Sequence, residues 1–146
     1  MNVTTSDANG VYRLERPEDG EVFATRAEKA GLDVLEIDLA EASTKADWLH
    51  ALNAAFELES PGKNWDSLYD SLTDPRERGV LVVLSNVEPL ARSSPDDLAD
   101  ACAVLRAVAD ELADDDTPFV VLITGGGPAT MHLPSLRADT STYETP

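Results

Sequence analysis

Two short apolar runs limit the folds open to this chain. Val80 to Leu84 and Phe119 to Ile123 are continuous apolar stretches rich in β-branched residues. A strand with one face in water alternates apolar and polar residues, whereas a strand buried on both faces reads as an unbroken apolar run. Both runs are therefore predicted to be central strands of a parallel sheet that is covered by helices.

The segments between these runs complete an α/β pattern. Apolar residues recur at helical spacing from Lys45 to Leu58 and from Asp96 to Leu112, and a short helix is predicted from Asn64 to Leu72. The segment from Leu32 to Leu39 ends in alternating apolar and acidic residues, as a half-buried strand does. The sequence thus predicts an α/β fold with a small, mainly parallel sheet flanked by helices.

The remaining segments divide the chain into four parts. Residues 1–9 are mostly polar and are expected to be loose, and residues 10–31 are expected to form an extension packed on the domain. Within that extension, Val11 to Leu14 would be an edge strand, and a helix would end near Gly31. The domain itself is placed at residues 32–124. Residues 125–146 are expected to be a flexible tail, because they lack apolar periodicity.

The charge balance narrows the range of partners. The chain has 28 acidic residues against 11 Lys and Arg, which gives a formal net charge of -17. Such a chain is poorly suited to nucleic acids, whose phosphates need basic residues, or to an anionic membrane surface. Its negative charge would increase the rate of association with a basic protein. The alternative is that the charge serves only solubility or adaptation to high salt.

The sequence also suggests a location. Neither apolar run approaches the roughly 20 apolar residues of a membrane helix. The first ten residues have no basic start and no apolar stretch, so we expect no secretory signal. Cys102 is the single cysteine, which rules out an intramolecular disulfide. We therefore expect a cytoplasmic protein that is monomeric when free.

The short helix predicted after residue 63 has two different faces. Asn64 is a good N-cap, and an apolar stripe then faces the core. Asp66 and Asp70 lie on the wet side as a like-charge pair one turn apart, which destabilises a helix slightly. Asp70 also lies near the C-terminal end, where cations are preferred. A helix face whose charges slightly destabilise the fold suggests that they serve to bind a basic partner. The alternative is an ordinary acidic surface without a partner.

The pattern Gly62-x-Asn64-x-Asp66-x-Leu68-x-Asp70, placed after a helix and before a buried strand, resembles the barstar family of intracellular barnase inhibitors. The likeness extends from about Leu32 to Ile123. It implies an inhibitor of the immunity or antitoxin type that blocks the active site of a basic ribonuclease or related toxin, and not an enzyme. An acidic adaptor of the same fold with a non-nuclease partner is the alternative.

The resemblance also implies which residues bind the partner. The loop at Gly62 would approach the partner closely, and Asp70 would occupy its phosphate pocket. Asp66 and Asn64 would make polar contacts, and Trp65 and Tyr69 would supply apolar contact or packing. Further contacts would come from Asp74 at the border and from Asp97 or Asp100 on the long helix. The chain departs from the family at Ser60-Pro61, where aromatic residues are expected, and at Asp74, where glycine is expected.

Nothing in the sequence forms a catalytic set. Neither His50 nor His132 has a cysteine or second histidine at ligand spacing, so no metal is expected. Cys102 falls on the inward face of a helix. The triple glycine at residues 125–127 is not followed by the Lys-Ser/Thr of a phosphate-binding loop. The Asp66–Asp70 pair lies along one exposed helix rather than across a cleft, which is unsuited to acid–base catalysis. We expect no catalytic residue and no cofactor.

Overall fold

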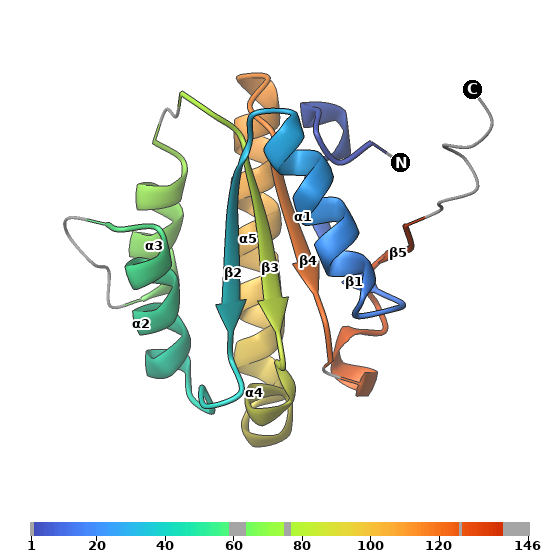
Figure 1. Cartoon of the computed structure of the whole chain (residues 1–146). Helices are drawn as coiled ribbons and strands as arrows, with labels where there is room; N and C mark the ends of the chain where they lie inside the picture. The colour runs from blue at the N-terminus through green and yellow to red at the C-terminus, as the bar shows by residue number, and fades with distance from the viewer. Residues whose placement is uncertain (1, 59–63, 75–76, 126, 139–146) are drawn as a thin grey trace.

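The computed structural model describes residues 2–58, 64–74, 77–125 and 127–138 (Figure 1). Its strands are β1 (Gly10–Leu14), β2 (Asp33–Asp38), β3 (Val80–Ser85), β4 (Phe119–Ile123) and β5 (Ser135–Leu136). The α-helices are α1 (Asp19–Lys29), α2 (Lys45–Ala55), α3 (Trp65–Leu72), α4 (Glu88–Ser93) and α5 (Pro95–Asp114). Two 3₁₀ helices are η1 (Ser6–Ala8) and η2 (Gly127–Thr130).

The strands form one parallel sheet in the order β2-β3-β4-β1-β5. Strands β3 and β4 are adjacent, with Val82 opposite Val121, and every residue of the two predicted apolar runs is buried. The predicted central strands and the α/β fold are thus confirmed. Strand β2 is at the edge, which explains its half-buried, partly acidic sequence.

Each face of the sheet has its own apolar core. Side chains that alternate along β3 and β4 point to opposite faces, so Val82 and Val121 pack among α2, α3, α4 and α5. Leu81 and Leu122 pack on the other face, under α1 and η1. Figure 1 shows α1 in front of the sheet and α5 behind it, with α2 and α3 beyond the β2 edge. None of the described helices is long and apolar enough to cross a membrane.

The N-terminal residues correct two expectations. β1 is not an edge strand, because it lies between β4 and β5. Residues 2–9 are not loose either, since Val3 and Ala8 are buried in the second core. The Asn9 side chain donates to the carbonyls of Ala109 and Thr117, both at 2.9 Å, and accepts from the Phe119 N–H at 2.7 Å. Three hydrogen bonds from one amide attach this polar segment to α5 and β4.

The C-terminal residues correct a third expectation. The predicted flexible tail is packed from residue 127 to residue 138, while residues 139–146 lie outside the described part. Strand β5 pairs with β1, and Leu133, Leu136 and Ala138 are buried. Asp19 accepts a hydrogen bond from the Ala138 N–H at 2.9 Å, and Arg16 donates to the Ala138 carbonyl at 2.7 Å. A few apolar residues and backbone hydrogen bonds hold this segment without any periodic pattern.

The predicted helices are present in the structure, but some of their ends differ from the predicted ends. The predicted cap of α3 is confirmed at Asn64, and Thr44 caps α2 by accepting from the Asp47 N–H. However, α2 ends at Ala55, three residues before the predicted end. Glu57 follows with a positive φ of 52°, a conformation that a continuing helix cannot adopt. The six-residue helix α4 was not predicted.

Candidate functional site

Helix α3 is held firmly at its first turn. Asn64 has extended backbone angles, and its Oδ1 accepts a hydrogen bond from the Ser67 N–H at 2.8 Å. This satisfies one of the free N–H groups at the start of a helix. Trp65, Leu68 and Leu72 are buried in the core shared with α2 and α5, as predicted. The cap and this stripe together fix which side of α3 faces water.

The outer side of α3 carries carboxylates. Asp66 and Asp70 are exposed, and Asp74 is exposed just beyond the C-cap. A spacing of four residues corresponds to about 6 Å along a helix, so Asp66 and Asp70 form the start of a row. Among the described residues, none of these three carboxylates has a hydrogen-bond or ion-pair partner. Tyr69 is half-buried beside them and packs on the core. We call Asp66, Tyr69, Asp70 and Asp74 the acidic face.

Thr73 closes this helix and was not singled out in the sequence. Its hydroxyl donates to the carbonyls of Tyr69 at 3.0 Å and Asp70 at 3.2 Å. The Tyr69 carbonyl also accepts the Thr73 N–H at 3.0 Å, so Thr73 bonds to the last turn of the helix through both its backbone and its side chain. A threonine directly after a predicted helix is the signal that could have identified it. Thr73 therefore fixes the backbone that carries Asp70.

Two predicted contact residues have internal roles. The Oδ1 of Asn64 is occupied by the cap, so only its amide group is left to face a partner. Trp65 is only 8% exposed, and the Lys45 ammonium lies 5.6 Å from the centre of its ring. Of the two roles expected for Trp65, its position favours packing. Lys45, at the start of α2, had no distinguishing signal in the sequence.

The remaining predicted residues are not brought to the acidic face by any described contact. Gly62 lies outside the described residues. Asp97 is in the first turn of α5, half-buried, with its N–H donating to Ser94 Oγ at 3.4 Å. Asp100 is exposed one turn later. Figure 1 shows that α5 begins next to α4, whereas α3 lies beside the middle of α5.

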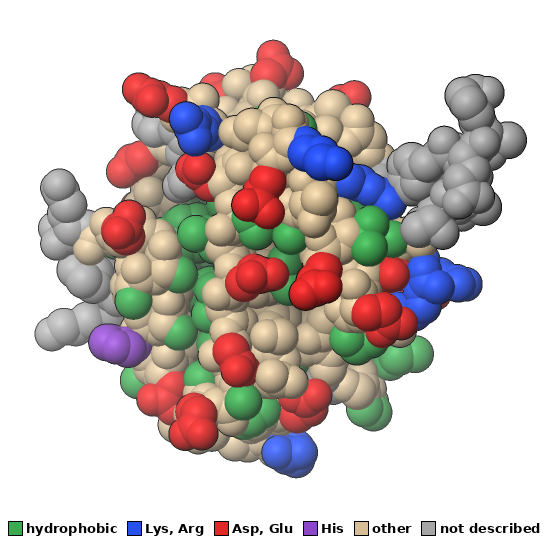
Figure 2. Space-filling view, viewed as in Figure 1, with side chains coloured by type: hydrophobic (Ala, Val, Ile, Leu, Met, Phe, Trp, Pro, Cys, Tyr) green, Lys and Arg blue, Asp and Glu red, His purple; other side chains and the backbone are tan. Residues whose placement is uncertain are grey.

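Asp38 provides a contrast with the acidic face. It accepts hydrogen bonds from the Asn86 side chain and the Ala40 N–H, both at 3.0 Å. These two donors, the Asn86 amide first, hold the pKa of Asp38 below its usual value. The carboxylates of α3 have no such donors within the part of the chain that the structure describes. Figure 2 shows further Asp and Glu side chains spread over the visible surface, so the acidic face lies within a broadly negative molecule.

The described residues include no cluster of metal-ligating side chains, and their one cysteine is not activated as a nucleophile. No group of three or more potential metal ligands occurs among residues 2–58, 64–74, 77–125 and 127–138. Burial raises the pKa of the Cys102 thiol to about 11, although Arg106 acts in the opposite direction. The thiol is therefore protonated at neutral pH, and a protonated thiol is a poor nucleophile. His50 is exposed on α2.

Comparison with known proteins identifies the family. The family model described as Barstar (barnase inhibitor) matches residues 32–124. Comparison with curated proteins gave no match. The matched segment covers more than half of the chain and contains β2, β3, β4 and all of α3. This chain therefore belongs to the barstar family.

Proposed function

We propose that this protein is an inhibitor that binds and blocks the active site of a basic ribonuclease or related toxin with the acidic face of α3. One observation carries the proposal. The carboxylates of Asp66, Asp70 and Asp74 are exposed and have no partner among the described residues; the first two are on a helix fixed by its cap and its buried stripe, and Asp74 follows its C-cap. Family membership supports the same function.

The chemistry of inhibition follows from these carboxylates. An active site that cleaves RNA holds phosphate groups with basic side chains, and a carboxylate offers similar negative oxygen acceptors. Asp70 would occupy the phosphate pocket, with Asp66 and Asp74 bonding to donors on either side. Tyr69 would add apolar contact at the centre. Because α3 is already ordered, little conformational entropy is lost on binding.

Other residues have supporting roles in the proposal. Asn64 and Thr73 position α3, and the loop at Gly62 would lie against the partner. Asp97 and Asp100 would add contacts only if the partner reaches the start of α5. The net charge of -17 favours a basic protein over nucleic acid or an anionic membrane. We also propose that the free protein is a monomer in the cytoplasm.

Replacing Asp70 with Ala separates binding from folding. The change removes a like-charge neighbour of Asp66 and a carboxylate at the negative end of α3, so stability should rise slightly, by about 0.3 kcal/mol. Binding should weaken by about 3 kcal/mol or more, because buried cations of the partner lose their counter-charge. A melting curve and a binding isotherm with a purified barnase-type ribonuclease measure the two effects.

Glu28→Ala is the matched control. Glu28 is exposed on α1, on the opposite face of the sheet, and its removal changes the net charge equally. The control should bind almost as well as the unaltered chain. Equal, small losses of affinity for both variants would leave only bulk charge and contradict the proposed site. A chain that binds no basic ribonuclease but captures another protein through Asp70 would favour an adaptor instead.

A further inference from the structure

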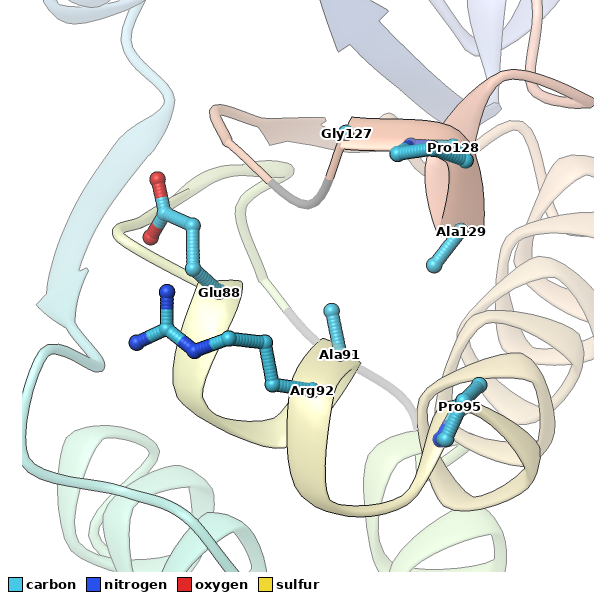
Figure 3. A pocket seen from close by; sticks show the side chains of 7 residues that line it. All are labelled: Glu88, Ala91, Arg92, Pro95, Gly127, Pro128 and Ala129. Atoms are coloured by element: carbon cyan, nitrogen blue, oxygen red, sulfur yellow. The ribbon is translucent and has the colours of Figure 1, made fainter.

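A pocket opens at the carboxyl ends of β3 and β4. It has a volume of about 500 Å³ and lies between α4, the start of α5 and η2 (Figure 3). Its wall is largely apolar, formed by Ala91, Pro95, Pro128 and Ala129. In open α/β sheets, ligands commonly bind beyond the carboxyl ends of the strands. The volume is also within the range of known ligand pockets.

This pocket depends on residues beyond the segment that matches the family. Gly127, Pro128 and Ala129 form one wall, and the family match ends at residue 124. The chain that follows this wall is held in place because Leu133 and Leu136 are buried. The pocket is therefore a feature that this chain adds to the matched fold, away from the acidic face of α3.

An exposed apolar side chain follows the pocket lining in the sequence. Met131 follows η2 directly, and its exposed fraction is 63%. Among the described residues it is the one large apolar side chain that is left exposed. Methionine is flexible and is often used at binding surfaces. Met131 is two residues after Ala129, which lines the pocket, and is therefore a candidate for contact with an occupant.

The charges at and near the pocket indicate which kind of segment would bind there. Glu88 and Arg92 extend from α4 at one side of the pocket in Figure 3. Asp96 and Asp97 follow Pro95 in the first turn of α5. The pocket lining thus carries one carboxylate and one guanidinium, two more carboxylates follow Pro95 in the chain, and the whole chain has a net charge of -17. A positively charged segment is attracted to such a place, and an acidic segment or a second copy of this chain is repelled.

We propose that this pocket is a second interaction surface, which takes an apolar side chain carried on a basic peptide segment of a partner protein. The apolar side chain fills the space lined by Ala91, Pro95 and Ala129. A neighbouring Lys or Arg of the partner pairs with Glu88. The surface does not require the acidic face of α3, so either site can fail without the other.

Three tripeptides blocked at both ends test the proposal: Lys-Leu-Lys, Lys-Ala-Lys and Glu-Leu-Glu. Each is titrated into the full chain while amide NMR signals are followed. We expect Lys-Leu-Lys to shift the signals of residues 88–95 and 127–131 saturably, with at least roughly fivefold higher affinity than Lys-Ala-Lys. Glu-Leu-Glu should produce no saturable shift.

Variants localise the effect. Ala91→Met fills the pocket and should abolish the preference for Leu over Ala, whereas Ala99→Met, at an exposed position of α5, should preserve it. If Ala91→Met does not fold, Ala129→Met fills the same pocket from the η2 side and replaces it in the test. Glu88→Gln should weaken Lys-Leu-Lys about threefold, and Glu111→Gln, an exposed acid near the other end of α5, should not.

Several results would overturn the proposal. Equal affinities for Lys-Leu-Lys and Lys-Ala-Lys would mean that only bulk charge attracts the peptides. Saturable binding of Glu-Leu-Glu would make Arg92 the selecting group and an acidic segment the occupant. A dimer in sedimentation that Met131→Ser dissociates would show that a second copy fills the pocket. The absence of shifts at residues 88–95 and 127–131 would show that no such site exists.

Discussion

Asn64 links the stability of α3 to the position of its carboxylates. Its side chain caps the helix, so Asn64→Ala should lower the free energy of unfolding by about 1 kcal/mol. Asn64→Ser keeps an oxygen acceptor at the cap and should lose much less. Urea denaturation of the three proteins measures this order, and the affinity for the ribonuclease should follow it.

The affinity of the Asn64→Ser variant tests the role of this residue in binding. A positioning role requires that the serine variant bind nearly as well as the unaltered chain. If it is stable but binds as poorly as Asn64→Ala, then the Asn64 amide contacts the partner directly, as the resemblance to the family first implied.

Asp19 should make stability depend on pH. Burial alone would raise its pKa, but the hydrogen bonds from Ala138 and Arg16 and the positive charges of Arg16 and Arg137 together outweigh burial and hold the pKa below its usual value. The pKa is thus lower in the folded than in the unfolded chain. The carboxylate therefore stabilises the fold above the unfolded pKa of about 3.9, and this contribution is lost as the pH falls through the folded value.

Asp19→Asn isolates that contribution. At pH 7 the variant should be less stable by about 1.5 kcal/mol, because a charged acceptor is lost from two hydrogen bonds. The difference should shrink below about pH 4, where the unaltered carboxyl group also becomes protonated. Thermal melts from pH 7 to pH 2.5 follow the change, with Glu21→Gln on the exposed side of α1 as control. A difference that is constant with pH would indicate a packing defect.

At the scale of elements, the sequence predicts the helices and strands whose residues repeat a pattern over several positions. The buried runs of β3 and β4 and the capped, two-sided helix α3 were predicted because many residues contribute to each signal. Helix α4 was missed because it has only six residues and contains Pro89. Strand β5 was missed because two residues cannot show alternation. The same limit applies to the acidic face, where the positions of Asp66 and Asp70 were predicted but the closure of the helix by Thr73 was not.

Removing the segment around β5 should therefore be costly. Leu133 and Leu136 are buried, and burying a leucine side chain contributes about 2 kcal/mol. A chain that ends at Gly127 should lose about 4 kcal/mol or more relative to one that ends at Ala138. Such a loss is a large part of the stability of a small domain. Chemical denaturation of the two chains measures it, and equal midpoints would mean that this segment does not stabilise the domain.

At the scale of the whole molecule, the segment that matches the family is only part of one folded unit. The apolar runs predicted strands buried on both faces, but they could not show what covers each face. Residues 32–124 provide α2 to α5 on one side of the sheet. Leu81, Val83, Val120 and Leu122 on the other side are covered by residues from both ends of the chain, among them Phe23 and Leu136. The ends therefore complete the core and position α3 indirectly, through the sheet.

The charge of the whole molecule should control how fast it finds a basic partner. With a net charge of -17, attraction acts before contact and raises the association rate, and dissolved salt screens it beyond about 10 Å at 0.1 M. Short-range contacts of Asp70 in a closed interface are screened much less. We therefore expect the association rate with a barnase-type ribonuclease to fall steeply from 50 to 500 mM salt, while the dissociation rate changes little. Stopped-flow measurements with the unaltered chain and Asp70→Ala separate the two effects, because the variant should retain the salt dependence of association and dissociate much faster. An association rate that does not respond to salt would show that the charge serves only solubility.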